Sequence, residues 1–413
     1  MLVRGRLLTD PDRAPTPGWL RVEAGRIAEM GEGEPPGRAR PDVGGPDRII
    51  CPGFIDAHLH IPQFDAVGCD GMGLLEWLER VIYPAERWFG AGAARTVTRL
   101  ALRRMLAQGT LGFAGYLTSH GEATREAVSA LEQSGVRCIV GRVAMDREAP
   151  DDLTREDRER ARMAPRPSAL APAARGGRVE ISANPRFAIS CSAELLAEVG
   201  WLRAEREGLC VQTHLAESAA ECGRVRALFP EALDYTDVYE RAGLLGPRTI
   251  LAHGCHLSER EWALIAERGC VVAHCPTANV FLRSGLFNLD AARRHGVRVA
   301  LGSDVAAGAD VAMPRVARAM IETAKIRAML SGRPGHVPTP GEAWRLITSG
   351  NGAALGWADA GTLCVGAPAD LLVLRAPETW LDGHLIGRLV YNWSGSLIET
   401  RVVGGAVVDP ASI

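Results

Sequence analysis

The stretch PGFIDAHLH, at residues 52–60, decides the fold of this chain. Its apolar run leads directly into His58 and His60, which are separated by one residue. Residues i and i+2 of a β-strand point to the same side, so both imidazoles can bind one ion without distorting the backbone. A histidine pair alone is a weak signal, because polar residues often end a strand. The apolar run before this pair favours a buried strand that ends in metal ligands.

Further apolar segments follow at intervals, and helical patterns such as those at 193–207 and 258–267 separate most of them. Eight strand–helix units within residues 51–362 predict a (β/α)8 TIM barrel, an α/β fold. The expected strands are 53–60, 110–116, 136–145, 179–189, 209–214, 249–253, 270–274 and 297–304.

Four of these expected strands end in a side chain that can bind a metal ion. The first strand carries His58 and His60, and later strands end in His214, His253 and Asp304. Catalytic residues of such barrels lie at the carboxyl ends of the strands. Each residue has an ordinary alternative, since a lone histidine often makes only a hydrogen bond and an aspartate can cap a helix. The recurrence at corresponding positions favours a metal site, with zinc as the first choice and iron(II) as the second.

Three other residues near strand ends receive weaker interpretations. Glu217 follows His214 by three positions and is the candidate proton carrier between a metal-activated water and the substrate. Its alternative is an acid in the first turn of a helix. His274 ends the seventh strand and His120 follows the second. Both are expected to be structural or loop residues, or to approach the site from its periphery.

Both chain ends have a β-rich texture that differs from the middle. Short strands are expected at 3–8, 18–23 and 26–30, and again at 370–374, 398–403 and 406–408, with a loop at 35–46. Residues 1–50 and 363–413 are therefore predicted to form one small β-sandwich domain, and residues 51–362 the barrel domain.

Composition excludes several functional classes. The 413 residues are 47% hydrophobic and 23% charged, with a net charge of −2, so no basic surface suggests a nucleic-acid or membrane partner. The sequence has no signal-peptide pattern and no apolar run long enough to cross a membrane. Its ten cysteines lack a CxxC pair and are expected to be reduced thiols, which favours a cytoplasmic location.

The order His58-x-His60, His214, His253 and Asp304 resembles the amidohydrolase superfamily over essentially the whole chain. Many members of that superfamily hold two metals, bridged by a carbamylated lysine at the end of strand four. The sole lysine here is Lys325, beyond strand eight, so the resemblance implies one metal per chain. The H-x-E…P-C-x-x-C signature of the cytidine deaminases is missing.

Within that superfamily, several segments resemble the guanine deaminases. They are PGFIDAHLHIPQ at 52–63, LLEWL at 74–78, YPAE at 83–86, VAMD at 143–146, PRF at 185–187, SCS at 190–192, THLAE at 213–217, AHGC at 252–255, AHCP at 273–276 with Asn279, and GSDV at 302–305. Generic members share the histidines but lack LLEWL and PRF, which makes this resemblance specific.

The resemblance implies a role for each matched residue. His58, His60, His214 and Asp304 would bind zinc, and His253 and Asp304 would position the attacking water. Gln63, Arg186, Phe187 and His253 would contact the ring. The implied reaction converts guanine to xanthine and ammonia, with attack at C2, protonation of N3 by Glu217, and Asp304 as the first acceptor of the water proton. Family members are usually homodimers.

Other functions remain as alternatives. Asp304 is followed by Val-Ala-Ala-Gly, where family members often have two glycines, and Pro62 precedes Gln63. These departures leave open deamination or dechlorination of another heterocycle, such as 8-oxoguanine, a pterin or a triazine. A catalytically silent binding protein with the same fold is the alternative from a different class, and the intact set of candidate residues argues against it.

Overall fold

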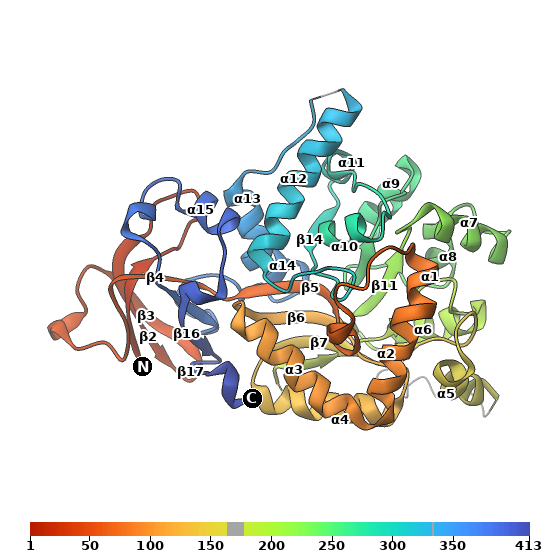
Figure 1. Ribbon diagram of the computed structural model, residues 1–413, viewed down its shortest axis with the longest axis horizontal. Coiled ribbons are helices and arrows are strands. Elements are labelled where there is room, and N and C mark those ends of the chain that lie inside the picture. The colour runs from red at the N-terminus through yellow and green to blue at the C-terminus, as the bar shows by residue number, and fades with distance from the viewer. Residues whose placement is uncertain (163–176, 333) are drawn as a thin grey trace.

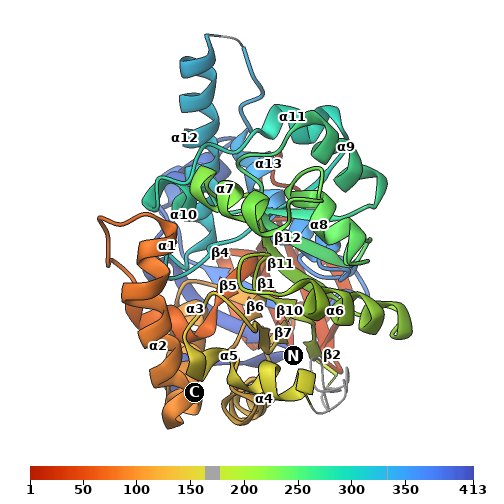
Figure 2. The same ribbon diagram turned by 90° about the vertical axis from the view of Figure 1, so that its right-hand side faces the viewer.

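The computed structural model describes residues 1–162, 177–332 and 334–413 (Figure 1). A (β/α)8 barrel forms the middle of the chain, as predicted. Its strands lie in the centre of the molecule, with α3, α4, α6, α9 and α12 around them (Figure 2). Two parallel four-stranded sheets carry most of the barrel wall. Their strands are β5 (Phe54–His60), β6 (Thr110–Tyr116), β7 (Arg137–Gly141), β9 (Val179–Ile181), β11 (Val211–Leu215), β12 (Thr249–His253), β13 (Val271–His274) and β14 (Arg298–Leu301).

The third and fourth predicted strands are each broken in two. Short strands β8 (Val143–Ala144) and β10 (Asn184–Pro185) follow the breaks and pair with each other. Arg142 lies at the first break, where its buried guanidinium donates to the Ser119 carbonyl and pairs with the Asp157 carboxylate. Arg142 therefore interrupts the run of apolar side chains in the third predicted strand. The hydrophobic periodicity of the sequence does not reveal this break.

Helices cover the outside of the barrel. The predicted helices at 193–207 and 258–267 are present, and Ser192 and Ser258 cap them by accepting hydrogen bonds from backbone amides of the first turn. The bounds are α1 (Leu74–Trp77), α2 (Tyr83–Trp88), α3 (Ala94–Ala107), α4 (Gly121–Ser134), α5 (Asp151–Arg162), α6 (Ala193–Glu205), α7 (Ala219–Leu228), α8 (Tyr235–Arg241), α9 (Glu259–Glu267), α10 (Pro276–Phe281), α11 (Leu289–Arg294), α12 (Met313–Ser331), α13 (Pro340–Arg345), α14 (Asn351–Ala354) and α15 (Leu385–Tyr391).

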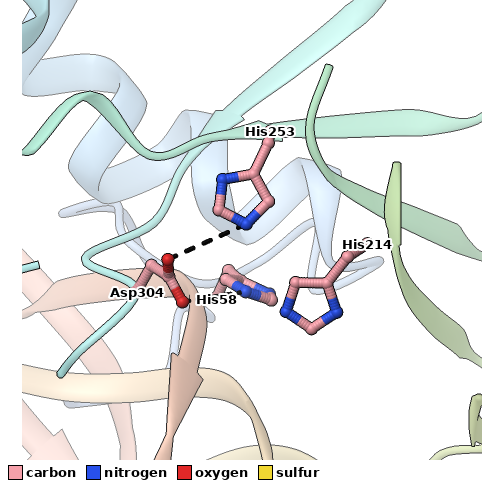
Figure 3. A group of neighbouring side chains, drawn as sticks. All are labelled: His58, His214, His253 and Asp304. Atoms are coloured by element: carbon pink, nitrogen blue, oxygen red, sulfur yellow. Dashed lines mark ion pairs between the residues drawn. The ribbon is translucent and has the colours of Figure 1, made fainter. Parts of the chain in front are cut away.

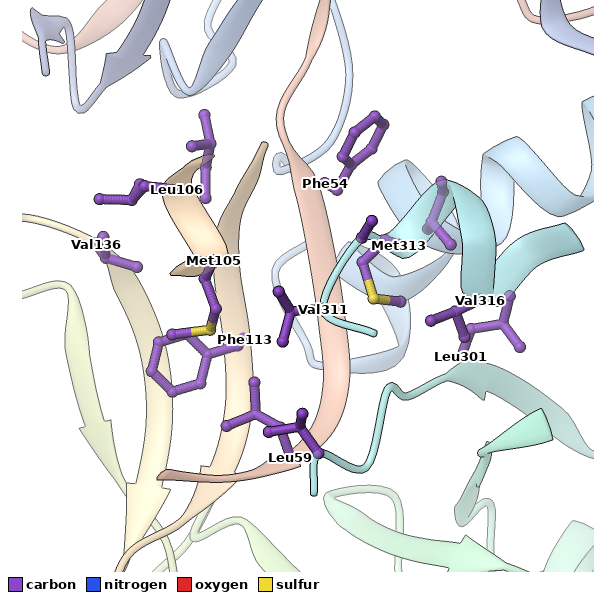
Figure 4. Close-up of a cluster of buried hydrophobic side chains, with 14 of the residues drawn as sticks. Phe54, Leu59, Met105, Leu106, Phe113, Val136, Leu301, Val311, Met313 and Val316 are labelled. Carbon is purple, nitrogen blue, oxygen red and sulfur yellow. The ribbon is translucent and has the colours of Figure 1, made fainter. Parts of the chain in front are cut away.

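The barrel strands and their helices share a large apolar core, part of which is drawn in Figure 4. Side chains from β5 and β6 meet side chains from α3 on one side and from α12 on the other. Full burial of each such side chain contributes about 1.5–3 kcal/mol to folding. Labelled members are Phe54, Leu59, Met105, Leu106, Phe113, Val136, Leu301, Val311, Met313 and Val316.

Both chain ends build one sheet beside the barrel (Figure 1). Its strands, in spatial order, are β17 (Ala406–Val407), β16 (Ile398–Val403), β15 (Leu371–Leu374), β4 (Val43–Pro52), β1 (Leu2–Leu7), β2 (Thr16–Glu23) and β3 (Arg26–Glu32). Backbone hydrogen bonds from Ile27 to Ala367 and from Ala369 to Gly25 connect the β3 end to the segment before β15, so the sheet curls around its own apolar core.

The predicted loop at 35–46 is shorter than expected, because β4 begins at Val43. Gly44, Gly45 and Pro46 hide this strand in the sequence, and its register against β1 shifts between Arg4 and Arg6. The division into domains at residues 51 and 362 stays a prediction. None of the described helices is long and apolar enough to cross a membrane.

Strands β14 and β5 close the barrel, although no ladder of paired residues joins them within the described ranges. Asn351, at the start of α14, is fully buried between them. Its amide nitrogen donates to the carbonyls of Ile55 (2.6 Å) and Leu301 (2.8 Å), and its oxygen accepts from the Leu301 amide (2.9 Å). One side chain therefore satisfies three backbone groups at the seam.

We expect Asn351→Ala to lower the free energy of unfolding by about 2–4 kcal/mol, because each buried backbone group left without a partner costs about 1–3 kcal/mol. Urea unfolding of the metal-free protein measures this. Asn392→Ala is the matched control, since Asn392 is exposed and donates only to the Arg388 carbonyl. Equal stability of the two variants would contradict the role of Asn351.

Candidate active site

The residues predicted to bind a metal come together at the carboxyl ends of the barrel strands. His58 and His60 lie on β5, His214 on β11 and His253 at the end of β12, and all are buried. Asp304 lies three residues beyond the end of β14, not on the strand as predicted. Its left-handed backbone (φ 50°) and a hydrogen bond from its amide to the His58 carbonyl (2.8 Å) place its carboxylate beside the histidines.

The side-chain atoms of these residues form one compact cluster (Figure 3). His58, His214, His253 and Asp304 each offer a ligand atom, and these four atoms lie within 4.8 Å of one another. His60 also belongs to the cluster, because its Nε2 lies 3.2 Å from Asp304 Oδ1 and 3.1 Å from His214 Nε2. Zinc and iron(II) are commonly bound in proteins by several imidazole nitrogens together with a carboxylate, as in this cluster.

Hydrogen bonds outside the cluster fix two of the imidazoles. His214 Nδ1 donates to the Arg186 carbonyl (2.7 Å), which leaves its Nε2 lone pair facing the cluster. His253 Nδ1 lies 2.9 Å from Asn279 Oδ1, and His253 Nε2 is buried with no hydrogen-bond partner among the described residues. An unpartnered buried nitrogen facing ligand atoms fits a site that binds a metal ion or a metal-activated water.

The charges in the cluster also fit a cation. Burial lowers the pKa of His60 to about 4, and burial together with the neighbouring histidines holds the pKa of His214 well below its usual value. Burial would raise the pKa of Asp304, but the imidazoles of His58 and His60 outweigh this and hold it well below its usual range. At neutral pH these groups therefore present neutral imidazoles and one carboxylate, which are the protonation states of metal ligands.

Glu217 lies on the loop between β11 and α7, next to the cluster. Its Oε1 accepts from the Ser284 hydroxyl (2.9 Å), and its Oε2 lies 3.5 Å from His253 Nε2. Burial and the nearby Asp304 carboxylate raise the pKa of Glu217 to about 8. A carboxyl group that is largely protonated at neutral pH can donate a proton, which is the predicted role.

A cavity adjoins the cluster and Glu217. One part of its wall is apolar and another carries two polar side chains, Gln63 and Arg186. A small planar ring with polar edges fits such a pocket. The lining residues are His60, Gln63, Leu74, Trp77, Leu78, Arg186, Phe187, His214, Glu217, His253, Leu282 and Asp304.

Sequence reasoning missed one buried acid beside the two polar residues. Glu86, on α2, accepts hydrogen bonds from Arg186 Nη1 (2.7 and 2.9 Å) and from Gln63 Nε2 (3.2 Å). Gln63 lies on the 3-10 helix η2 (Ile61–Ala66), which Pro62 helps to start, and Arg186 follows β10 directly. The YPAE motif contains Glu86, but nothing in that motif indicates that its partners come from two distant segments.

The remaining histidines and Lys325 lie outside the cluster. His274 is buried and stacks on Phe287, with ring centroids 4.4 Å apart, and His120 packs against the backbone of Gly90. His256 is exposed, and its Nε2 donates to the Ser284 carbonyl (2.6 Å). Lys325 is exposed on α12, far along the chain from strand four, as expected from its position in the sequence.

The sequence model of the amidohydrolase family matches residues 49–408. The guanine deaminase of Escherichia coli (strain K12) is 32% identical over 402 residues, which cover 96% of this chain and 88% of the relative. A probable guanine deaminase of Deinococcus radiodurans is 35% identical over 377 residues, which cover 87% of this chain and 83% of the relative.

A solved structure supports the same relationship. The guanine deaminase of C. acetobutylicum, with guanine bound in its active site, superposes with a TM-score of 0.88 at 27% identity over 99% of both chains. The family match covers most of the sequence, including every predicted metal ligand. This chain therefore belongs to the amidohydrolase family.

Proposed function

We propose that this protein is an enzyme that hydrolyses guanine to xanthine and ammonia, as a step of purine breakdown. The observation that carries the proposal is the shared cavity: the buried His/Asp cluster, Glu217, and the polar pair Gln63 and Arg186 all face it. Relatives similar over most of the chain are guanine deaminases. One similar solved structure holds guanine in its active site.

One zinc ion per chain is the proposed cofactor, with iron(II) as the second choice. His58, His60, His214 and Asp304 would hold it. Their buried donor atoms and the fixed orientation of His214 support this assignment. A zinc ion held there acts as a Lewis acid and makes a water molecule nucleophilic near neutral pH. With its one lysine exposed on α12, the chain has no lysine to bridge a second metal.

The chain's own side chains would move the protons. Asp304 accepts a proton from the attacking water, and His253 orients that water through its unpartnered Nε2. Glu217 protonates N3 as the oxygen–C2 bond forms, which leaves the ring neutral and C2 tetrahedral. The proton held by Asp304 then passes to the amino nitrogen, and cleavage of the C2–N bond releases ammonia. The remaining hydroxyl proton returns to Glu217, which leaves a carbonyl at C2, and the N3 proton stays on the ring, so the product is neutral xanthine.

The purine would lie between the apolar wall and the polar pair. Arg186 donates to the ring carbonyl at C6, and Gln63 binds the neighbouring polar edge. Phe187 and Trp77 belong to the wall of the cavity and pack against the ring. Ala307, which departs from the family pattern, is buried in the core and is not one of the cavity-lining residues. That departure therefore gives little support to 8-oxoguanine, a pterin or a triazine as the substrate.

A homodimer in the cytoplasm is the proposed state of the protein. Ile326, Met329 and Leu330 are exposed near the end of α12, where they offer an apolar surface for a second copy. Met329→Glu combined with Leu330→Glu should then give a monomer in sedimentation equilibrium, at protein concentrations where the unaltered chain is a dimer.

Substrate choice is tested with the purified, zinc-loaded protein by measuring ammonia release from guanine, 8-oxoguanine, a pterin and an aminotriazine. We expect guanine to give the highest kcat/KM. An aminotriazine lacks the carbonyl and N–H edge that Arg186 and Gln63 would bind, and 8-oxoguanine and a pterin share that edge but are larger than guanine. Turnover of another ring in the absence of guanine turnover would refute guanine as the substrate. No turnover of any ring would favour the silent binding protein.

His214→Ala should abolish both metal binding and activity, because it removes a ligand whose orientation is fixed by the Arg186 carbonyl. Plasma emission spectrometry of the purified protein and the ammonia assay measure the two effects. The matched control is His384→Ala, since His384 is exposed at the start of α15. A His214→Ala protein that retains its metal or its activity would remove this residue from the ligand set.

Glu217→Gln should retain the metal and lower kcat by about 10²–10⁴-fold, because the amide keeps the shape but cannot transfer the proton. The control is Glu259→Gln, an exposed carboxylate that pairs with Arg294 and His295 on the surface. Steady-state kinetics with guanine distinguish the two. A kcat for Glu217→Gln within a factor of three of the control would show that another group carries the proton.

A further inference from the structure

We infer that Glu86 is a positioning residue that sets the ring-edge specificity of the pocket, by holding Gln63 as a hydrogen-bond acceptor and Arg186 as a donor. The inference rests on the proposed function and adds the class of ligand edge that this site accepts. That edge has a carbonyl next to a ring N–H, as in a neutral cyclic lactam. Glu86 itself need not touch the ring.

The side chains of Glu86, Arg186 and Gln63 form a buried hydrogen-bonded network. Glu86, Arg186 and Gln63 are 1%, 3% and 2% exposed. Both Glu86 oxygens accept from Arg186 Nη1, and Oε1 also accepts from Gln63 Nε2. Tyr83, one turn earlier on α2, places its ring 5.6 Å from the Arg186 guanidinium carbon. A buried charge pair with this many contacts has little freedom to change its geometry.

The contact with Glu86 decides which end of the Gln63 amide faces the cavity. The NH2 group donates to the carboxylate, and a flipped amide would place its oxygen against the negative charge of Glu86. Among the described residues, Gln63 Oε1 has no hydrogen-bond partner, and Gln63 lines the cavity. Gln63 therefore offers a hydrogen-bond acceptor, and a ligand that binds to it needs an N–H donor at that position.

The same contact occupies Nη1 of Arg186 and balances the positive charge of the guanidinium with the negative charge of Glu86. The Glu86 carboxylate lies 2.7 Å from the buried guanidinium of Arg186, which is a permanent cation. Among the described residues, Nε and Nη2 of Arg186 have no hydrogen-bond partner, and Arg186 lines the cavity, so these donors are available to a ligand. Because the pair has no net charge, it favours a neutral carbonyl oxygen over an anionic ring.

These two constraints together select the ring edge. An acceptor from Gln63 and donors from Arg186 complement an N–H adjacent to C=O, which guanine presents at N1 and C6. A purine without the C6 carbonyl offers a ring nitrogen acceptor there and would leave both protein groups unmatched. Glu86 therefore sets the preference for a purine with a C6 carbonyl and an N1–H, although it takes no part in the reaction itself.

Two probes isolate this edge in the metal-loaded protein. Hypoxanthine has the carbonyl and the N–H, and unsubstituted purine has neither. Calorimetric titration gives both dissociation constants without relying on turnover. The unaltered protein should bind hypoxanthine more tightly than purine. Glu86→Gln should weaken the binding of hypoxanthine by at least about tenfold and change that of purine by less than about threefold, because a neutral amide no longer holds the donor and acceptor that only hypoxanthine meets.

Glu261→Gln is the matched control, because Glu261 is also a buried carboxylate but caps α9 and binds Thr236 away from the cavity. Neither probe should change with it. Glu86→Asp keeps the charge but shortens the reach, and should lie between Glu86→Gln and the unaltered protein, which provides the test if Glu86→Gln does not fold.

Three outcomes would overturn the inference: equal weakening of both probes, no weakening of either, or no preference for hypoxanthine in the unaltered protein. The proposed function fails separately, if the unaltered protein does not release ammonia from guanine. Kinetics add a further check, since Glu86→Gln should raise KM for guanine more than it lowers kcat.

Discussion

The site and the barrel both depend on the attachment of Asp304 to β5. The Asp304 amide donates to the His58 carbonyl, and the Asp304 carboxylate lies within 3.3 Å of His58 Nε2 and His60 Nε2. The same contacts that bring the end of β14 to β5 therefore place a carboxylate between two histidines. Asn351, at the start of α14, bridges the same two strands. Barrel closure and the metal-site cluster therefore share contacts, and we expect a change at this seam to affect both.

Much of this arrangement could be predicted from local sequence. The i, i+2 spacing of His58 and His60 follows from strand geometry alone, and His214 and His253 end strands that stand out as apolar runs. The resemblance to the guanine deaminases supplied the pocket residues Gln63, Arg186 and Phe187, all of which line the cavity. Each of these predictions depends on a single short segment of the sequence.

Features that depend on distant segments could not be predicted in this way. The break at Arg142 is explained by Ser119 and Asp157, and the buried Glu86 matters because η2 and the end of β10 both reach it. Strand β4 was hidden by its glycines and proline, since its pairing comes from β1 and β15 and not from its own propensity. The predicted eighth strand includes Asp304, because the left-handed backbone at Asp304 leaves no mark in the hydrophobic pattern.

Arg186 belongs to both the metal side and the ring-binding side of the site. Its carbonyl orients His214 in the cluster, and its guanidinium faces the cavity under the control of Glu86. The ring-binding side and the metal side are therefore set by one short segment after β10. Anomalous X-ray scattering at the zinc edge, on crystals of the zinc-loaded protein, locates the metal. We expect one peak per chain, within coordination distance of His58, His60, His214 and Asp304. Two peaks, or one peak away from these side chains, would contradict the proposed metal site.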